Sequence, residues 1–183
     1  MESVVERVLV SEEEIEEITR RIAAKINEDY KDSGKQLLIV CILKGSLMFT
    51  SALMKRINLP VEIDFMRVSS YGAGTKSSGN IIIKLNLERK DLHERDILII
   101  EDIVDSGRTL NALTTHFREI GVKSVRTCTL LDKPSRREVD FTPDYIGKEI
   151  PDEFVVGYGL DYAENYRTLP YVAILKPRVY KSK

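Results

Sequence analysis

Hydrophobic and polar residues near the start of the chain follow a helical pattern. The sequence Ser11-Glu12-Glu13-Glu14 is a capping box, with Ser11 as the N-cap and Glu14 as the third helical residue. The hydrophobic residues that follow recur every three or four positions, which places them on one face of a helix. We therefore predict a helix up to about residue 30, whose buried face consists of Ile15, Ile18, Ile22, Ala23 and Ile26.

Short apolar stretches separated by polar turns predict β-strands. Residues 36–43 are rich in Leu and β-branched residues, which is typical of a strand buried on both faces. Residues 61–68 alternate like a strand with one buried face, and residues 81–87 can return beside them as the second arm of a hairpin. Further strands are predicted at residues 97–100 and 124–131.

The segments between these strands predict helices, at residues 47–57 and at residues 110–120, where Gly121 ends the second helix. Strands that alternate with helices imply right-handed crossovers and a parallel sheet. From Asp132 onward the pattern is irregular, with short strands at residues 154–158 and 172–175 that would cover the sheet. We expect an α/β fold, a parallel β-sheet flanked by helices.

The predicted fold is a single domain over residues 1–183. Its core is expected at about residues 36–131, and a small hood at about residues 132–183 together with the N-terminal segment. Residues 69–80, SSYGAGTKSSGN, hold three Gly and four Ser and have almost nothing to bury. We expect them to form a flexible β-hairpin loop, and long loops of this kind in compact domains are often functional lids.

Composition and charge narrow the possible partners. The 28 Lys and Arg are balanced by 29 Asp and Glu, whereas nucleic-acid-binding proteins usually carry a basic excess or stripe. The basic segments 133–137 and 176–183 are short and are interpreted as a solvated loop and a solvated terminus. No apolar run has the length of a membrane span, and the N-terminus does not resemble a secretion signal. We therefore expect a cytoplasmic protein that binds neither nucleic acid nor membranes.

Cysteine and histidine give no sign of a metal site. Cys41 and Cys128 each lie in a predicted apolar strand, so we expect buried, reduced thiols. His93 and His116 have no Cys or His neighbour at ligand spacing.

The segment 97–110, ILIIEDIVDSGRTL, combines a strand, two carboxylates and a turn that opens a helix. Ligands of a parallel sheet bind at the carboxyl ends of its strands, where Glu101 and Asp102 are expected. The turn offers free backbone N–H groups and a helix N-terminus, which suit a phosphate. The carboxylates can accept hydrogen bonds from a sugar diol and help to hold Mg²⁺. A ligand with a phosphate, a diol and a metal-bound pyrophosphate meets all of these demands.

This segment closely resembles the phosphoribosyl-pyrophosphate-binding signature of the type I phosphoribosyltransferases. Ordered matches to that family extend from about residue 38 to residue 167 and include Leu43-Lys44-Gly45, Ser70-Tyr71, Lys133 and the segment 154–162, FVVGYGLDY. Within the family the chain is similar to the bacterial hypoxanthine phosphoribosyltransferases. The resemblance implies a purine salvage enzyme with the type I phosphoribosyltransferase fold. It would move a phosphoribosyl group from 5-phosphoribosyl 1-diphosphate to hypoxanthine or guanine, giving IMP or GMP and pyrophosphate.

The resemblance also implies roles for the donor-binding residues. Glu101 and Asp102 would engage the ribose hydroxyls, directly or through Mg²⁺. Neighbouring side chains of a continuing strand point to opposite faces, so both can serve one sugar only if the strand ends there. The 5′-phosphate would be held by the backbone and hydroxyls of the turn Asp105, Ser106, Gly107, Arg108 and Thr109.

Pyrophosphate would be bound by Lys44 and Gly45, where the resemblance implies a non-proline cis peptide, and by Arg167. Asp161 would hold a second Mg²⁺, so the expected metal ligands are Glu101, Asp102 and Asp161. Closure of the loop that contains Ser70 and Tyr71 would exclude water from the reacting sugar.

The base would be recognised mainly from the C-terminal part of the chain. Asp105 would act at N7 of the purine as general base, and as acid in the reverse direction. Lys133 would donate to the 6-oxo group, Phe154 would stack on the base, and the Val155 backbone would read its 2-position. The family also suggests a homodimer or homotetramer.

Two alternatives remain open at this point. One is a nucleotide-sensing regulator of the same fold that binds RNA, although it would not need the acid/base carboxylate of Asp105 and would favour a basic surface. The other is a phosphoribosyltransferase that prefers xanthine, whose 2-oxo group would be read by the backbone near Val155. Lys133 argues against adenine as the substrate. A P-loop kinase is excluded because the sequence has no G-x-x-x-x-G-K-[ST] motif.

Overall fold

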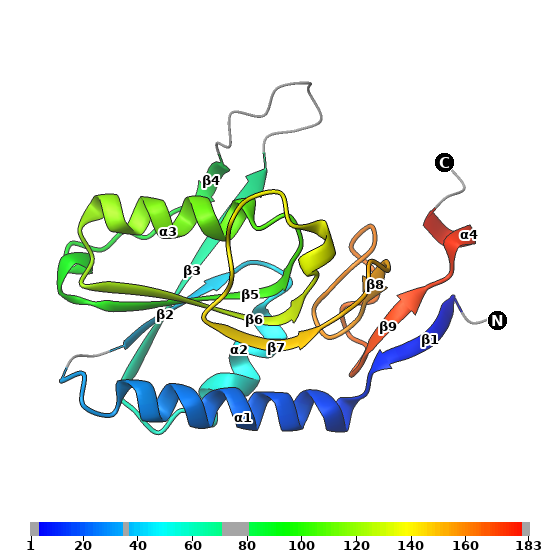
Figure 1. Ribbon diagram of the computed structural model, residues 1–183, viewed down its shortest axis with the longest axis horizontal. Helices are drawn as coiled ribbons and strands as arrows, with labels where there is room; N and C mark the ends of the chain where they lie inside the picture. Colours follow the sequence, from blue (N-terminus) through cyan, green and yellow to red (C-terminus); the bar gives the residue numbers. More distant parts are fainter. Residues whose placement is uncertain (1–3, 35–36, 71–80, 181–183) are drawn as a thin grey trace.

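The central layer of the protein is a six-stranded sheet (Figure 1). The computed structural model describes residues 4–34, 37–70 and 81–180. The strand order is β4-β3-β2-β5-β6-β7, in which β4 is antiparallel to β3 and the other neighbours are parallel. The strands are β2 (Leu37–Ile42), β3 (Val61–Ser70), β4 (Ile81–Leu85), β5 (Asp96–Val104), β6 (Ser124–Asp132) and β7 (Tyr145–Glu149).

Helices cover both faces of this sheet, as the alternation of strands and helices predicts. Helices α1 (Glu12–Tyr30) and α2 (Leu47–Met54) pack on one face, against Ile39, Leu98 and Ile100. Helix α3 (Arg108–Ile120) packs on the other face, on the side of Ile97 and Ile99. Figure 1 shows α1 and α3 on opposite sides of the strands. Because β2 and the start of β5 are buried on both faces, their sequences are continuously apolar.

Two predicted helix ends are confirmed, the start of α1 and the end of α3. The Ser11 side chain accepts a hydrogen bond from the backbone N–H of Glu14 at 3.2 Å, so Ser11 is the N-cap of α1. Gly121 follows α3 with φ +83°, a left-handed conformation that glycine adopts without a steric penalty.

A second, three-stranded sheet forms a hood beside the first. Its order is β1-β9-β8, and all of its pairings are antiparallel. The carboxyl ends of the parallel strands point toward the hood (Figure 1). The remaining short elements are two 3₁₀ turns and a C-terminal helical turn. The bounds are β1 (Val5–Val10), β8 (Val155–Val156), β9 (Val172–Leu175), η1 (Leu92–Glu94), η2 (Pro134–Arg136) and α4 (Pro177–Tyr180).

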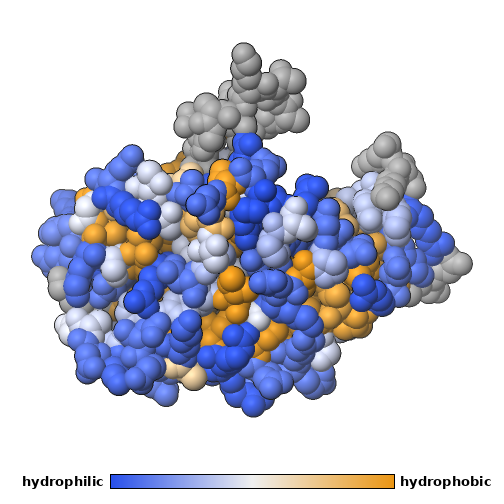
Figure 2. Space-filling view, viewed as in Figure 1, coloured by the Kyte–Doolittle hydropathy of each residue, from blue (hydrophilic) through white to orange (hydrophobic). Residues whose placement is uncertain are grey.

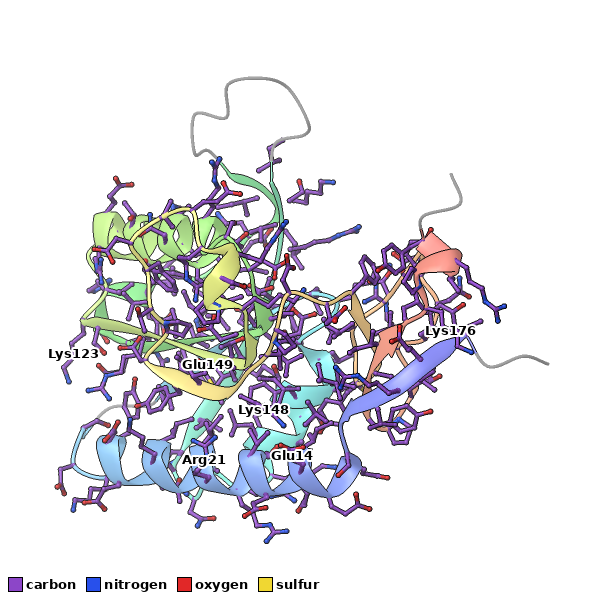
Figure 3. The ribbon with its side chains drawn as sticks, turned by 45° about the vertical axis from the view of Figure 1, so that its right-hand side comes forward. Glu14, Arg21, Lys123, Lys148, Glu149 and Lys176 are labelled. Carbon is purple, nitrogen blue, oxygen red and sulfur yellow. The ribbon has the colours of Figure 1, made fainter. Side chains whose placement is uncertain are left out.

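Strand β7 forms one edge of the core sheet, and side chains of helix α1 bind to it. The guanidinium of Arg21 donates to the carbonyl of Gly147 at 2.5 Å, and Lys148 forms an ion pair with Glu14 (Figure 3). These contacts occupy part of an edge that would otherwise present unpaired backbone groups. Figure 2 shows hydrophilic side chains over most of this face of the molecule, and smaller hydrophobic areas that run from β7 toward the hood.

Several predicted boundaries are wrong, and two strands were missed. Strand β5 does not end at residue 100 but continues to Val104, while α2 ends at Met54 and β8 is limited to two residues. Strands β1 and β7 were not predicted. Strand β3 extends to Ser70, so the first two residues of the predicted loop belong to the hairpin, and residues 71–80 lie outside the described part of the chain. Both thiols are free and buried, as expected.

No helix within the described ranges is long and apolar enough to span a membrane.

Candidate functional site

The turn between β5 and α3 encloses a small cavity at the carboxyl end of the sheet. The cavity has a volume of about 120 Å³ and lies beside the N-terminus of α3. Gly107 precedes the helix with φ +79°, and the Arg108 N–H donates to the Ser106 hydroxyl at 3.3 Å. The lining residues are Glu101, Ile103, Val104, Asp105, Ser106, Gly107, Thr109 and Leu110. The predicted phosphate turn therefore lines a cavity, whereas the Arg108 guanidinium pairs with Glu138 at 2.6 Å.

The two adjacent carboxylates point in different directions, because β5 continues past them. Glu101 lines the cavity, and its Oε2 atom is buried with no hydrogen-bond partner among the described residues. Asp102 lies toward the loop after β2, and its Oδ1 accepts from the Ile103 N–H at 2.8 Å. The condition under which both could contact one sugar, a strand that ends at this point, is therefore not met.

Burial changes the acidity of both groups. It raises the pKa of Asp102 to about 6, against the opposing effect of the Ile103 N–H hydrogen bond. Burial, with a smaller contribution from the charge of Asp102, raises the pKa of Glu101 well above its usual range. A carboxylate that is costly to ionise in the free protein gains most from a cation or a set of hydroxyl donors.

Two glycines allow the hood, the loop after β2 and strand β5 to meet closely. A Cβ atom at Gly45 would lie 1.5 Å from Asp102 Oδ2, and one at Gly159 would lie 2.0 Å from the Gly45 carbonyl oxygen. Gly159 also has φ +100°. The peptide between Leu43 and Lys44 is cis, as the resemblance implied. Glycine is therefore required by contact at both positions, and at Gly159 by conformation as well.

Two cations face the same region from opposite elements. Lys44 Nζ and Arg167 Nη2 bind the same oxygen of Glu164, at 2.9 Å and 3.3 Å. Arg167 is also held by the Gly159 carbonyl at 2.7 Å and by Asp161 Oδ1 at 2.9 Å. The hydrogen bond from Lys44, followed by that from Arg167, lowers the pKa of Glu164. The carboxylate of Glu164 therefore bridges Lys44 and Arg167, the two side chains predicted to bind pyrophosphate.

Lys133 approaches the turn from the end of β6. Only 7% of the residue is exposed, and its Nζ lies 3.5 Å from Asp105 Oδ1. The Lys133 N–H donates to the Val104 carbonyl at 2.8 Å, which fixes the backbone beside β5. The ammonium group of Lys133 therefore lies beside the half-exposed carboxylate of Asp105, which lines the cavity.

Arg137 also holds the turn in place, a role that no local sequence pattern indicated. Its guanidinium donates to the Asp105 carbonyl at 2.5 Å and forms an ion pair with Asp132. Its Cδ would lie 2.8 Å from a Cβ at Gly107. The interpretation of residues 133–137 as a solvated loop is therefore wrong for Lys133 and Arg137, since both side chains are largely buried. Their contacts depend on tertiary pairing that no local pattern encodes.

Phe154 immediately precedes the hood strand β8 and belongs to an aromatic cluster. Its ring stacks on Tyr180 with centroids 4.7 Å apart and meets Tyr162 edge-on at 5.6 Å. Phe154 is 37% exposed, whereas the next residue, Val155, is buried. An exposed aromatic ring next to an ordered backbone can receive a planar ligand.

Comparison with known proteins agrees with this arrangement. A family model described as a phosphoribosyl transferase domain matches residues 9–163. The chain belongs to the phosphoribosyltransferase family.

Two relatives of known function match over the full length of the chain. A hypoxanthine-guanine phosphoribosyltransferase of Bacillus subtilis is 51% identical over 178 residues, which cover 97% of each chain. A protein of the same description from Staphylococcus aureus is 49% identical over 182 residues, which cover 100% of each chain. The architecture above is thus the type I phosphoribosyltransferase fold.

Solved structures give the same result. A hypoxanthine phosphoribosyltransferase of Staphylococcus aureus superimposes with a TM-score of 0.91 at 49% identity, covering 98% of each chain. One from Trypanosoma cruzi superimposes with a TM-score of 0.93 at 39% identity, covering 100% of this chain and 97% of that one.

Most of the residues predicted from the family signature come together. The turn 105–109, Glu101 and Lys133 surround the cavity or its opening, and Lys44, Gly45, Asp102, Asp161 and Arg167 form a second group beside it. Ser70 ends strand β3, and Tyr71 lies outside the described residues. Sequence reasoning missed Arg137 beside the turn, Glu164 between the two cations, and Tyr180 in the aromatic cluster of Phe154.

The carboxylates suit Mg²⁺ by their chemistry but do not form a complete site alone. Within residues 4–34, 37–70 and 81–180, no three His, Cys, Asp or Glu side chains cluster as metal ligands. The buried, unpartnered Glu101 oxygen and the Asp102 and Asp161 carboxylates are nevertheless the oxygen donors that a hard cation prefers. A phosphoribosyltransferase site of this kind would need ligand oxygens to complete the coordination.

Proposed function

We propose that this enzyme transfers the phosphoribosyl group of 5-phosphoribosyl 1-diphosphate to hypoxanthine and guanine, releasing pyrophosphate. The observation that carries the proposal concerns Glu101, which lines the same cavity as the N-terminus of α3. Its Oε2 atom is buried and has no hydrogen-bond partner within the part of the chain that the structure describes. A sugar diol can donate to this oxygen while its phosphate binds the helix N-terminus. The full-length matches to hypoxanthine-guanine phosphoribosyltransferases support this choice of substrates.

The donor would lie along the end of β5. The backbone of the turn and the hydroxyls of Ser106 and Thr109 would hold the 5′-phosphate, and Glu101 would accept from the ribose hydroxyls. Arg137 would contribute indirectly, because it fixes the carbonyl of Asp105. Preorganised donors of this type stabilise charge without having to reorient during the reaction.

Pyrophosphate would bind between Lys44, the backbone at Gly45, and Arg167. Glu164 has to leave this position first, because its carboxylate occupies both cations. Mg²⁺, held by the donor's own oxygens together with Asp102, Asp161 and Glu101, would neutralise the charge of the leaving group. Asp102 and Asp161 lie on the pyrophosphate side and Glu101 on the ribose side, which divides the metal-binding carboxylates between two positions.

The base would lie between the turn and the hood. Lys133 would donate to the 6-oxo group, Phe154 would stack on the ring, and the Val155 backbone would read the 2-position. Asp105 would accept the N7 proton as the base attacks C1 of the sugar, and would return it in the reverse reaction. Lys133 Nζ lies 3.5 Å from Asp105 Oδ1, so both side chains could reach the one edge of the base that carries N7 and the 6-oxo group.

We further propose that the enzyme works in the cytoplasm as a homodimer or homotetramer. Leu47 and Met48, at the start of α2, are 47% and 42% exposed and follow directly on the predicted pyrophosphate loop. Exposed apolar side chains beside a functional loop are common at subunit contacts. Light scattering of the purified protein tests this directly, and a monomer at micromolar concentration would contradict it.

The decisive experiment is a spectrophotometric assay with the phosphoribosyl donor, Mg²⁺ and five bases. Hypoxanthine and guanine are expected to react, xanthine slowly, and adenine and uracil not at all, since Lys133 requires a 6-oxo acceptor. A chelator should abolish the activity. Turnover of xanthine well above that of hypoxanthine would replace the proposed substrate, and no turnover of any base would refute the transferase assignment.

A further inference from the structure

The ring of Phe154 is covered on one face by a residue from the far C-terminal end of the chain. The centroid of the Tyr180 ring lies 4.7 Å from that of Phe154 with an interplanar angle of 20°, and the Tyr162 ring is nearly perpendicular to Phe154, at 87°. Phe154 is nevertheless 37% exposed. A planar ring has two faces, and Tyr180 stacks on one of them.

The positions of the neighbouring segments indicate which face is occupied. The segment that precedes Phe154, residues 150–153, is bonded to the segment around Lys133. The Ile150 N–H donates to the Asp132 carbonyl at 2.8 Å, and Asp152 pairs with Arg136 at 3.7 Å. Figures 1 and 3, which differ by a rotation of 45°, both show β8 between η2 and α4. Tyr180 belongs to α4, so it reaches Phe154 from the side of β8 that lies away from η2.

The segment that carries Tyr180 is held on two sides. The Leu175 N–H donates to the Phe154 carbonyl at 2.9 Å, and the Lys176 N–H donates to the Val4 carbonyl at 3.0 Å. The helical turn α4 begins one residue later, and its Val179 N–H bonds to the Lys176 carbonyl at 2.9 Å. The residues that directly precede β8 and β1 therefore both fix the position from which Tyr180 reaches the ring.

We propose that Tyr180 is a positioning residue for the purine base, which acts by stacking on the outer face of Phe154. This inference rests on the proposed function, in which Phe154 stacks on the base. A half-exposed aromatic side chain loses rotational freedom when a ligand binds, and that loss weakens binding. Tyr180 restricts the ring beforehand, so the base joins an ordered stack of Tyr180, Phe154 and purine. Parallel stacking of aromatic rings adds to the free energy of their burial.

The test compares three single variants with the wild-type enzyme in steady-state assays. Tyr180→Leu keeps an apolar side chain but removes the ring, and we expect it to raise the KM for hypoxanthine about threefold to tenfold. The KM for the phosphoribosyl donor and the melting temperature should remain near wild type. Tyr180→Phe retains the ring and should behave like wild type. Val179→Ala is the matched control, because it loosens the same helical turn without removing the stacked ring.

A double-substitution cycle separates positioning from general support. In a Phe154→Leu background no ring remains to be positioned, so Tyr180→Leu should have no further effect on the KM for hypoxanthine. Equal effects in both backgrounds, a matching rise in the donor KM, or a lower KM in Tyr180→Leu would each overturn the proposal. The last result would mean that Tyr180 occupies the base-binding face itself. Absence of transferase activity in the wild type as well would instead refute the proposed function, and the role of Tyr180 with it.

Discussion

The two sides of the site are built in different ways. The donor side is one continuous segment, in which the buried strand β5 leads through a glycine turn into α3. The hood side joins the two-residue strand β8 to an irregular segment where Ala163, Glu164 and Tyr166 have positive φ. Its functional side chains are fixed by long-range contacts, such as those between Lys44 and Glu164.

This difference suggests a division of work. A rigid, local turn suits the constant part of the substrates, the ribose 5-phosphate. The hood, made from segments that are distant in sequence, holds the parts that change during the reaction, the base and the leaving group. Substitutions on the donor side should therefore lower kcat with every base. Substitutions in the hood should change the KM of either the base or pyrophosphate, but not of both.

Asp105→Asn should produce the largest effect on the donor side. Loss of the proton acceptor is expected to lower kcat about 100-fold to 10,000-fold. Donor affinity should change little, because the turn backbone and the Arg137 contact to the Asp105 carbonyl are retained. Steady-state kinetics and calorimetry with the donor and Mg²⁺ measure the two quantities separately. Near-normal turnover would remove Asp105 from the acid/base role.

Lys133→Ala should affect the base rather than the donor. Loss of a charged hydrogen bond in a nearly buried position is expected to lower kcat/KM for hypoxanthine about tenfold to a hundredfold. The preference for hypoxanthine over adenine should shrink by a similar factor, while the donor KM stays near wild type. The exposed Lys123, also at one end of β6, provides a control as Lys123→Ala. An unchanged base preference would refute the assignment.

The raised pKa values of the two carboxylates predict a pH dependence of donor binding. Because Mg²⁺ and hydroxyl donors favour the ionised form, donor affinity should fall by about tenfold per pH unit below about pH 6, where Asp102 becomes protonated. Calorimetry with the donor and Mg²⁺ between pH 5 and 8 measures this, and a flat profile in the wild type would contradict it. The Asp102→Asn variant should show a weaker dependence.

The same shift has an opposite consequence for stability. The pKa of Asp102 is about 6 in the folded protein, above the ordinary value of 3.8, so the folded state binds more protons between these values. Stability in the absence of ligands should therefore fall as the pH rises through this window and level off above it. Thermal melts of the wild type and of Asp102→Asn should converge at low pH and separate as the pH rises.

The smallest predicted effect concerns the carboxylate that bridges the two hood cations. Glu164→Gln removes a competitor of pyrophosphate at Lys44 and Arg167, so the KM for pyrophosphate in the reverse reaction should fall by roughly twofold to fivefold, as expected for a largely exposed ion pair. The KM for IMP should not change. Glu153→Gln, on the approach to β8, is a suitable charge-matched control. A higher KM for pyrophosphate would show that Glu164 helps to bind it.

The sequence predicted the donor side better than the hood, for physical reasons. Buried strands and capped helices have strong local patterns, so α1, α3 and the strands β2 and β6 were placed within a few residues. Strands β1 and β7 lie at sheet edges and carry exposed polar residues, so their sequences lack a continuous apolar run. The opposite orientations of Glu101 and Asp102 follow from strand alternation once β5 is known to continue.

The residues that were missed share one property. Arg137, Glu164 and Tyr180 act through partners far away in the sequence or through unusual backbone conformations. No single-residue propensity reports such contacts, whereas the family signature located only the residues that face the ligand directly.

The contact between Gly159 and the carbonyl of Gly45 has a consequence for the dimensions of the site. At this point the hood and the loop after β2 touch through main-chain atoms, without room for a single methyl group. No change of rotamer can lengthen or shorten that distance. The contact therefore acts as a spacer of constant length between the hood segment proposed to read the base and the loop proposed to receive the leaving group.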